Sequence, residues 1–331
     1  MGKKKKLTEN KITRLGTFNL QGKLGMMGQS IMLFKDMIRR KLDICAFQET
    51  LLQEDKEFLD EKKGMIINLA GPAPTNGGRK YGMGFFISNK WKEQLEGVRS
   101  INEKISVIKF AINKDKTNTL SIINVYGPTM LRAEEDENEV IKFYGELEQT
   151  YLQEKKRATL IMIVGDYNAK IGRKRNEQEK FMGRNGKGFR NENGKKLQEF
   201  LEGNDLYLAN THFNHRDHHI ATWHHEMEGK TDVHNQIDYI AIQRRNLGIV
   251  KDARAYNNQI YRSDHAIVVA NIQLNEIYRL SRKKFQKIEK YNLEPLKNDE
   301  EMRNTYIRTL SNKIAAKTFI RQYENLEGET K

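Results

Sequence analysis

The chain of 331 residues contains 58 lysines and arginines against 44 aspartates and glutamates, which gives a net charge of +14 and a pI near 9.5. This positive excess predicts a polyanionic partner. With 37% hydrophobic and 31% charged residues, the chain can form a sizeable core but is too charged for an integral membrane protein. Its longest aliphatic run, residues 160–164, is far shorter than the roughly 18 residues of a membrane-spanning helix.

The chain begins with MGKKKKLTENK, which has the positive charge of a signal peptide but not the apolar stretch that should follow. We therefore do not expect secretion. The lysines at 3–6 suggest a nuclear address or an arm for nucleic acid, and a solvated disordered tail is an equally good interpretation. We treat residues 1–11 as a basic tail and expect a nuclear protein.

Cys45 is the single cysteine of the chain. It excludes an internal disulfide and any zinc site built from several thiolates. Its apolar neighbours predict a buried core thiol rather than a nucleophile.

Eight short apolar runs with β-branched residues predict strands. They lie at residues 12–19, 43–49, 81–88, 105–112, 119–126, 159–166, 236–242 and 265–272. Several neighbouring runs are joined by short polar connections that suit hairpins. Because the strands outnumber the helices, two sheets covered by helices fit better than one parallel sheet.

Apolar side chains at helical spacing predict helices between these strands. The first helix follows the first strand, and its proposed apolar face consists of Met27, Ile31, Phe34 and Ile38. Further helices are predicted at 138–153 and, after an Asn-Glu-Asn-Gly turn, at 195–202. The apolar face of the helix at 138–153 consists of Val140, Phe143, Tyr144 and Leu147.

The composition changes after residue 274 to alternating charges and helix-forming residues. We place a domain boundary there, with a main domain at 12–274 and a helical extension or linker at 275–331. One face of this extension carries apolar residues at helical spacing, which suit docking on its own domain or on a neighbour. These residues are Met302, Tyr306, Leu310 and Ile314.

Polar side chains stand at the ends of several predicted strands, where a carboxylate is costly unless it is paired or binds a metal. They are Asn19, Glu49, Asp166, Asn168, Asp238, Asp264 and His265. Each alone is typical of a turn or a structural pair. Together, the hard oxygen ligands suit Mg²⁺ or Mn²⁺ rather than zinc, and a histidine with a carboxylate partner suits phosphate chemistry.

Six segments in order along the chain resemble the motif series of the endonuclease/exonuclease/phosphatase superfamily. They are TFN at 17–19, QET at 48–50, NVYGP at 124–128, GDYN at 165–168, TW at 222–223 with QIDYI at 236–240, and SDH at 263–265. Three longer stretches are similar to the apurinic-type endonuclease domain of RTE-type non-LTR retrotransposons, whose host-encoded relatives are called craniofacial development protein 2-like. These stretches are VGDYNAKIGR, MGRNGKGFRNENG and TWHHEMEGKTDVHNQIDYI.

The resemblance implies an α/β fold, a four-layer α/β/β/α sandwich of the DNase I type with a C-terminal helical extension. It also implies that Glu49 binds a Mg²⁺ ion, for which Mn²⁺ could substitute, with Asn19 and Asp264 close to it. A second carboxylate ligand near Asn19 is not evident, so the number of metal ions stays open. Tyr167 stands where many relatives have phenylalanine, a change that should be tolerated.

The same resemblance implies the catalytic roles of five residues. Asp166 would orient and deprotonate the attacking water, and Asn168 would hold the phosphate and the base. His265, oriented by Asp238, would bind the scissile phosphate. Tyr126 would contact the phosphate or the leaving oxygen.

The implied function is a DNA endonuclease that nicks its target and leaves a 3′ hydroxyl to prime reverse transcription. The tail around residues 291–313 is similar to the segment that precedes the reverse transcriptase in such elements. The chain itself shows no Asp-Asp polymerase signature, so a separate reverse transcriptase module is an expected partner besides DNA. We expect a monomer without a membrane partner. The alternatives are an abasic-site repair endonuclease, a phosphatase or nuclease acting on inositol lipids or poly(A), and a domesticated chromatin-binding protein without turnover.

Two cationic loops, at 71–82 and 170–190, are candidates for following a DNA backbone, with solvated surface loops as the even alternative. Arg184 in the second loop is our candidate for substrate binding. Trp223 is a second candidate, although a core or hairpin anchor is the more typical role for a tryptophan. Seven of the eight histidines lie between residues 212 and 234. Their spacing matches no known zinc or nickel pattern, so a polar loop on the substrate side is favoured.

Overall fold

The structure, a computed structural model, describes residues 12–52, 54–70, 82–113, 117–129, 133–225, 233–276, 299–305 and 307. The chain divides into two compact units, Met1–Arg279 and Leu280–Lys331. Three predictions lie outside the described residues: the basic tail, the loop at 71–81, and the part of the C-terminal apolar face formed by Tyr306, Leu310 and Ile314. Within the described part of the chain, no helix combines the length and the apolar character needed to cross a membrane.

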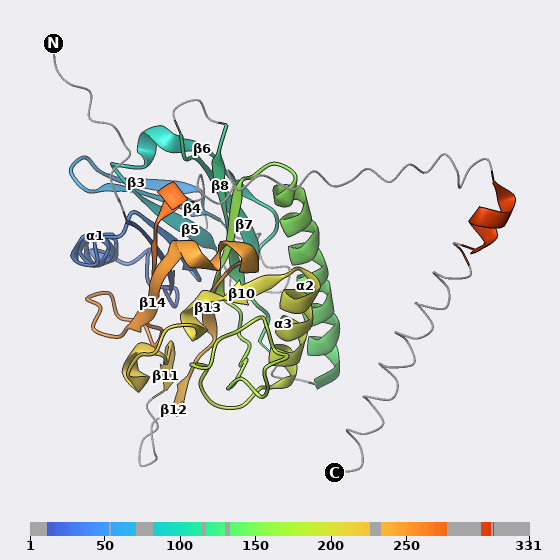
Figure 1. Ribbon diagram of the computed structural model, residues 1–331. Helices are drawn as coiled ribbons and strands as arrows, with labels where there is room; N and C mark the ends of the chain where they lie inside the picture. The colour runs from blue at the N-terminus through green and yellow to red at the C-terminus, as the bar shows by residue number, and fades with distance from the viewer. Residues whose placement is uncertain are drawn as a thin grey trace. The chain divides into compact units, whose positions relative to one another are not determined.

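The first unit contains two mixed sheets (Figure 1). In the described residues, the first sheet has seven strands in the order β14 (Val250–Tyr256), β15 (Ile267–Ile272), β1 (Thr13–Asn19), β2 (Ile44–Gln48), β5 (Met83–Ser88), β4 (Gly64–Leu69) and β3 (Lys56–Asp60). Its β1 and β2 are parallel, while the other neighbours are antiparallel.

The second sheet has six strands among the described residues. Their order is β10 (Leu206–Leu208), β13 (Asp238–Gln243), β9 (Leu160–Asp166), β8 (Thr119–Tyr126), β7 (Ile105–Ala111) and β6 (Leu95–Ser100). Here β8 and β9 are the parallel pair. A separate antiparallel pair is formed by β11 (Trp223–His225) and β12 (Val233–Asn235).

All eight predicted strands are present, with ends that differ by no more than two residues from the predicted ones. The inner strands β2 and β9 are buried along their whole length, because one face meets the other sheet and the opposite face meets helices. The edge strands β3 and β6 are charged and largely exposed, which keeps a sheet edge from pairing with another chain. The polar strands β3 and β6 lack the apolar runs that predict a strand, and β10, β11 and β12 are too short to form one. These five strands, together with β4 and β14, were not predicted.

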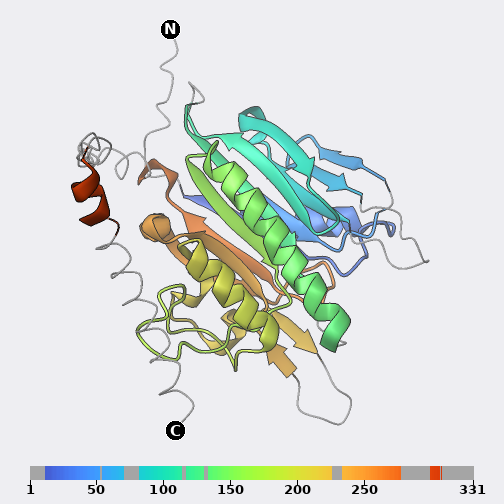
Figure 2. The same cartoon turned by 90° about the vertical axis from the view of Figure 1, so that its right-hand side faces the viewer.

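Helices lie on the outer faces of the two sheets. Figures 1 and 2 show α2 (Ala133–Lys155) and α3 (Glu192–Gly203) side by side on the second sheet, and Figure 1 shows α1 (Gln29–Arg39) at the opposite side of the molecule. The predicted apolar face of α2 is confirmed, since it forms one buried cluster with strands of the second sheet and with α3. The layers of the first unit therefore run helix, sheet, sheet, helix.

The predicted apolar face of α1 is wrong except for Phe34, which is buried. Met27 precedes the helix and is fully exposed, while Ile31 and Ile38 are about half exposed. The buried face instead contains Leu33 and Phe34, together with Met37 and the carboxylate of Asp36. Both sets have helical spacing, so only the position of the neighbouring sheet and of the loop bound by Asp36 decides which one faces inward.

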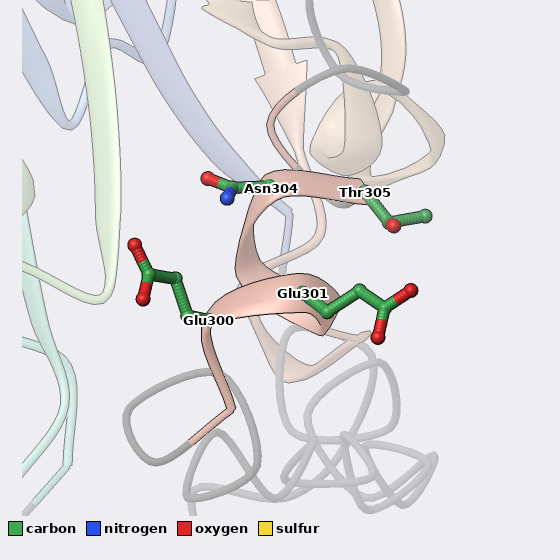
Figure 3. Close-up of a pocket in the computed structure, with 4 residues that line it drawn as sticks. All are labelled: Glu300, Glu301, Asn304 and Thr305. Atoms are coloured by element: carbon green, nitrogen blue, oxygen red, sulfur yellow. The ribbon is translucent and has the colours of Figure 1, made fainter.

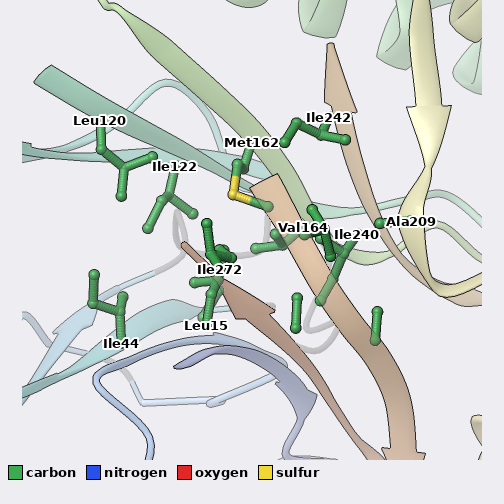
Figure 4. Packing of buried hydrophobic residues seen from close by; sticks show 14 of the residues in the cluster. Leu15, Ile44, Leu120, Ile122, Met162, Val164, Ala209, Ile240, Ile242 and Ile272 are labelled. Atoms are coloured by element: carbon green, nitrogen blue, oxygen red, sulfur yellow. The ribbon is translucent and has the colours of Figure 1, made fainter. Parts of the chain in front are cut away.

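The largest hydrophobic cluster fills the space between the two sheets (Figure 4). Leu15 and Ile44 of the first sheet face Ile122, Met162 and other aliphatic side chains of the second. A polar link crosses this core, because Gln48 Nε2 donates to Asn124 Oδ1 at 2.7 Å. The two sheets are thus joined both by apolar packing and by a buried hydrogen bond beside the strand ends.

The second unit contains a described helical segment at residues 300–305. Asp299 precedes it, and its Oδ1 accepts a hydrogen bond from the backbone N–H of Met302 at 3.0 Å, as an N-cap does. A hollow beside the segment is lined by Glu300, Glu301, Asn304 and Thr305. Their side chains point in different directions from the helix (Figure 3), and none is a predicted site residue.

Candidate active site

Strand pairing brings the predicted polar residues to one end of each sheet. In the first sheet, parallel β1 and β2 place Asn19 level with Gln48, directly before Glu49. In the second sheet, Tyr126 of β8 and Asp238 of β13 are both level with Asp166 of β9. Residues as far apart in the chain as Asp166 and Asp238 are therefore neighbours.

Asn19 joins the two sheets at this end. Its Nδ2 donates to Glu49 Oε1 at 2.8 Å and to Asp166 Oδ2 at 3.0 Å. Its Oδ1 accepts from the backbone N–H of Gln21 at 2.9 Å, so the amide orientation is determined by its partners. Asn19 is fully buried and acts as the bridge between the carboxylates of the two sheets.

His265 and two carboxylates form the second half of the cluster. Nδ1 of His265 lies 3.0 Å from Oδ2 of Asp238, and its Nε2 lies 3.7 Å from Oδ2 of Asp166. All three side chains are buried, and their ligand atoms lie within 4.8 Å of one another. Asp166 is therefore shared between the Asn19–Glu49 pair and the Asp238–His265 pair.

Burial and charge shift the pKa values in this cluster. Burial acts to lower the pKa of His265, but the charges of Asp238, Asp166 and Asp264 outweigh it and raise the pKa to about 10. Burial, followed by the charge of Asp238, raises the pKa of Asp166 to about 7, against the opposing effects of His265 and two hydrogen-bond donors. The raised pKa of His265 favours the protonated imidazole at neutral pH, and the raised pKa of Asp166 makes its carboxylate a better proton acceptor than an ordinary aspartate.

Asp264 completes the cluster from the loop before β15. Its Oδ2 accepts from Nε1 of Trp223 at 3.0 Å, and its Oδ1 lies 3.8 Å from Nε2 of His265. This Oδ1 atom is buried and has no hydrogen-bond partner among the residues that the structure describes. A buried carboxylate oxygen without a hydrogen-bond donor is suited to act as a ligand of a cation.

The backbone is strained at two of the site residues. Glu49 and Asn168 have φ angles of 50° and 49°, in a left-handed region that residues other than glycine rarely adopt. Asn168 is held there by its own N–H, which donates to Asp166 Oδ1 at 2.8 Å, and by its Nδ2, which donates to the carbonyl of Gly127 at 2.8 Å. Strain held in place by surrounding contacts is typical of functional sites.

Several residues that hold the cluster in place were not predicted from the sequence. Thr222 Oγ1 accepts the backbone N–H groups of Ile237 and Asp238, both at 3.0 Å. Ser263 Oγ donates to the carbonyl of Asn19 at 2.8 Å and accepts the N–H of His265. Both lie inside the TW and SDH motifs, but an uncharged hydroxyl carries no signal of its own.

A carboxylate in α1 supports the loop that leads to Asp264 and His265. Asp36 is fully buried and accepts backbone N–H groups from Ile260 and Tyr261, in each case at 2.7 Å. It also pairs with Arg39 at 2.9 Å. Local sequence gives no sign of this role, since an aspartate in a helix of mixed composition is usually solvated.

The two predicted substrate-binding residues differ in their position. Trp223 lies at the site, where it donates to Asp264, forms an isolated β-bridge with His265 and stacks on His225. Arg184 is about four-fifths exposed and pairs with Glu177 at 2.9 Å, without a contact to the cluster. Its substrate role therefore stays a prediction.

The histidine-rich stretch forms no metal cluster within the described residues. Its histidines have other partners: Nε2 of His215 lies 2.8 Å from Asp252 Oδ1, Nδ1 of His219 lies 2.8 Å from the carbonyl of Ala255, and the Nδ1 atoms of His224 and His234 are 2.7 Å apart. Cys45 is buried as predicted, and burial raises its pKa well above the ordinary value, which keeps the thiol protonated.

Known proteins resemble this chain both in sequence and in fold. No family model matches the chain. It is 30% identical over 196 residues to craniofacial development protein 2 of Bos taurus, a match that covers 59% of this chain and 31% of that protein. The chain thus spans about a third of the length of the curated relatives it matches.

Three solved structures share the fold. The endonuclease domain of TRAS1, a telomere-specific non-LTR retrotransposon, is 15% identical with a TM-score of 0.52, covering 79% of this chain and 98% of that domain. The AP endonuclease LMAP of Leishmania major is 14% identical with a TM-score of 0.58, covering 79% of this chain and 88% of that protein. The 3′ phosphatase NExo of Neisseria, bound to a product DNA hairpin, is 14% identical with a TM-score of 0.54, covering 78% of this chain and 99% of that protein. The chain therefore shares the fold of these nucleases and is similar, over part of its length, to craniofacial development protein 2.

Proposed function

We propose that the chain is a divalent-metal-dependent phosphodiesterase that nicks DNA and leaves a 3′ hydroxyl. The observation that carries this proposal is the convergence of Asn19, Glu49, Asp166, Asp238 and His265 in one buried, hydrogen-bonded cluster. Structural proteins have little use for four buried or half-buried ionisable groups at one point, because each costs desolvation energy.

The donor set fits a hard cation such as Mg²⁺ or Mn²⁺. Asn19 joins the carboxylates of Glu49 and Asp166, and Oδ1 of Asp264, 3.8 Å from Nε2 of His265, is buried without a donor among the described residues. When bound, such an ion would neutralise charge on the scissile phosphate and lower the pKa of a nearby water. We propose Glu49 and Asp264 as its ligands, with Asn19 adjacent.

The protein groups supply the remaining chemistry. Asp166, with a pKa of about 7, can accept a proton from the attacking water near neutral pH. His265, with a pKa of about 10, presents a protonated Nε2–H that can stabilise the charge growing on the phosphate oxygens. Asp238 orients the ring through Nδ1, which leaves Nε2 for the substrate. Asn168 and Tyr126 stand at neighbouring strand ends, where they can position the phosphate.

DNA as the substrate is supported by charge and by the similar proteins. The net charge of +14 favours a polyanion. Among the structures that share the fold, one is described as a retrotransposon endonuclease domain and another is bound to a DNA hairpin. We propose that the nick serves target-primed reverse transcription, with the polymerase supplied by another module.

The test is nicking of supercoiled plasmid at low salt with Mg²⁺, compared with the same reaction in EDTA. We expect relaxed circles only with the metal ion, and at least a 100-fold lower rate for Asp166→Asn, since removal of a general base typically costs a factor of roughly 10² to 10⁴. Asp217→Asn is the matched control, because its carboxylate is almost fully exposed and lies outside the cluster.

The outcome separates the proposal from its alternatives. Cleavage confined to an oligonucleotide with one abasic site would assign the chain to abasic-site cleavage, and the Leishmania protein that shares its fold is described as an AP endonuclease. Phosphate release from inositol lipids would change the substrate class. Tight DNA binding without cleavage at any divalent ion would overturn the enzymatic proposal and support a DNA-binding role.

A further inference from the structure

One aromatic side chain stands out on the loop that leaves the active site. Phe189, in the sequence GKGFR, is 74% exposed, the most exposed phenylalanine among the described residues. Nζ of Lys170 lies 5.7 Å from the centre of its ring. A cation beside an exposed ring is a surface that attracts flat, electron-rich groups attached to an anion.

The backbone around Phe189 is anchored on both sides. Arg173 N donates to the carbonyl of Gly188 at 3.1 Å, and Asn191 N donates to the carbonyl of Lys170 at 3.1 Å. The next residue, Arg190, is buried, with Nη1 at 2.7 Å from Glu179 Oε1. The backbone that carries Phe189 is therefore held on both sides, and its ring is exposed to solvent.

The anchor also places Phe189 near the catalytic cluster. Lys170 is two residues beyond Asn168, and two residues span at most about 7 Å. Ala169 and Ile171 beside it are fully buried, so this connection is fixed in the core. The Cα atom of Lys170 thus lies within about 7 Å of that of Asn168, and Nζ of the same lysine lies 5.7 Å from the ring of Phe189.

The surrounding charge favours a nucleic acid over a protein partner. The segment 170–190 contains eight basic and two acidic residues, and Arg173, Arg175 and Lys180 are exposed. An apolar protein surface would bring no compensating charge to these cations, whereas a nucleic-acid strand supplies phosphates for them and a base for the ring.

We propose that Phe189 and Lys170 form a stacking site for an unpaired nucleobase next to the phosphate that is cut. The proposal rests on the proposed function and deepens it, because it names the form of DNA that binds best: a duplex with a short unpaired stretch. The ring stacks on the base, while Lys170 and its basic neighbours contact the adjoining phosphates. Fully paired DNA offers no free base face and gains only the phosphate contacts.

The experiment measures the binding of the whole chain to two labelled oligonucleotides in EDTA, where cleavage does not interfere. One is a continuous duplex and the other has three unpaired nucleotides at its centre. We expect the wild type to bind the second roughly tenfold more tightly, the size of effect that one stacked base provides. Phe189→Ala and Phe189→Leu should lose this preference, and Phe189→Tyr should keep it.

Ile141→Ala is the matched control, since Ile141 is an exposed apolar residue on α2 and should leave both affinities unchanged. A Leu variant that binds as well as the wild type would overturn stacking. Unchanged binding by Phe189→Ala would also overturn it and leave the ring as a protein contact. The plasmid assay tests the proposed reaction separately. If the protein nicks plasmid but does not prefer unpaired DNA, only the stacking site is disproved. If it prefers unpaired DNA but does not nick plasmid, the proposed reaction is disproved.

Discussion

Nε2 of His265 lies 3.7 Å from Oδ2 of Asp166, so an imidazole with a pKa of about 10 and a carboxyl with a pKa of about 7 share one buried site. Each group shifts the other. The charge of Asp166 raises the pKa of His265, and the charge of His265 opposes the rise at Asp166. Between these two pKa values the carboxylate is ionised and the imidazole is protonated, which is the pairing that base-assisted phosphate hydrolysis needs.

The first prediction concerns the dependence of nicking on pH. The rate should rise as Asp166 loses its proton near pH 7 and fall as His265 loses its proton near pH 10. Asp238→Asn should move both limbs to lower pH, because the Asp238 charge raises the pKa of both groups. The measurement is kcat/KM from pH 5 to 10.5, and a rate that is flat between pH 5 and 8 would exclude Asp166 as the base.

The second prediction concerns stability. The folded-state pKa of His265 is raised above its usual 6.5, so its contribution is complete below pH 6.5 and is lost as the pH rises toward 10. Asp166, raised above 3.8, acts with the same sign between pH 3.8 and 7. Urea unfolding of metal-free protein at pH 6, 8 and 10 should show a falling free energy of unfolding.

His265→Gln should remove the part of this fall that comes from the imidazole and flatten the curve toward pH 10, while loss of the imidazole charge moves the titration of Asp166 to higher pH. His218→Gln, an exposed histidine outside the cluster, should leave it unchanged. If the wild type were as stable at pH 10 as at pH 6, the favourable charge pairing at His265 would be disproved.

The third prediction tests the link between α1 and the loop before the catalytic histidine. Asp36→Ala leaves the N–H groups of Ile260 and Tyr261 without their acceptor, at about 1–3 kcal/mol for each buried group. We expect the free energy of unfolding to fall by about 2–4 kcal/mol, with slower nicking, because the shifted loop carries Asp264 and His265.

Asp36→Asn keeps one acceptor oxygen and should lose less stability, and Asp217→Asn, whose carboxylate is almost fully exposed, is the control. Equal stability of Asp36→Ala and the wild type in urea would show that the loop is held by other contacts.

The fourth prediction concerns Gly165, directly before Asp166. Its φ is 151°, and a Cβ there would lie 2.0 Å from the carbonyl oxygen of Val125. Gly165→Ala should destabilise the fold by more than ~2 kcal/mol and reduce nicking, because the backbone that carries Asp166 has to move. Gly145→Ala has open space in α2 and should stabilise by up to about 1 kcal/mol. Thermal unfolding of the two variants gives the comparison, and similar melting temperatures would contradict it.

Much of the fold follows from local sequence. The buried strands β2 and β9 consist mainly of continuous apolar runs, and the buried face of α2 is complete within one helix. Such patterns act over a few residues, so they predict the element wherever it packs. The α1 face fails for the opposite reason: two apolar stripes compete, and the choice depends on a sheet and a loop that are distant in sequence.

The sequence by itself determined which chemistry is available: polar residues at the ends of apolar strands, six ordered motifs and a strong positive charge. Only the tertiary structure decided that Asn19 bridges Glu49 and Asp166, that Asp36 holds the loop before His265, and that Arg184 stays apart. The physical reason is the distance along the chain over which each kind of interaction acts. Hydrophobic periodicity is written in neighbouring residues, whereas the burial, hydrogen bonds and charges that shift a pKa come from segments that meet only when the two sheets pack.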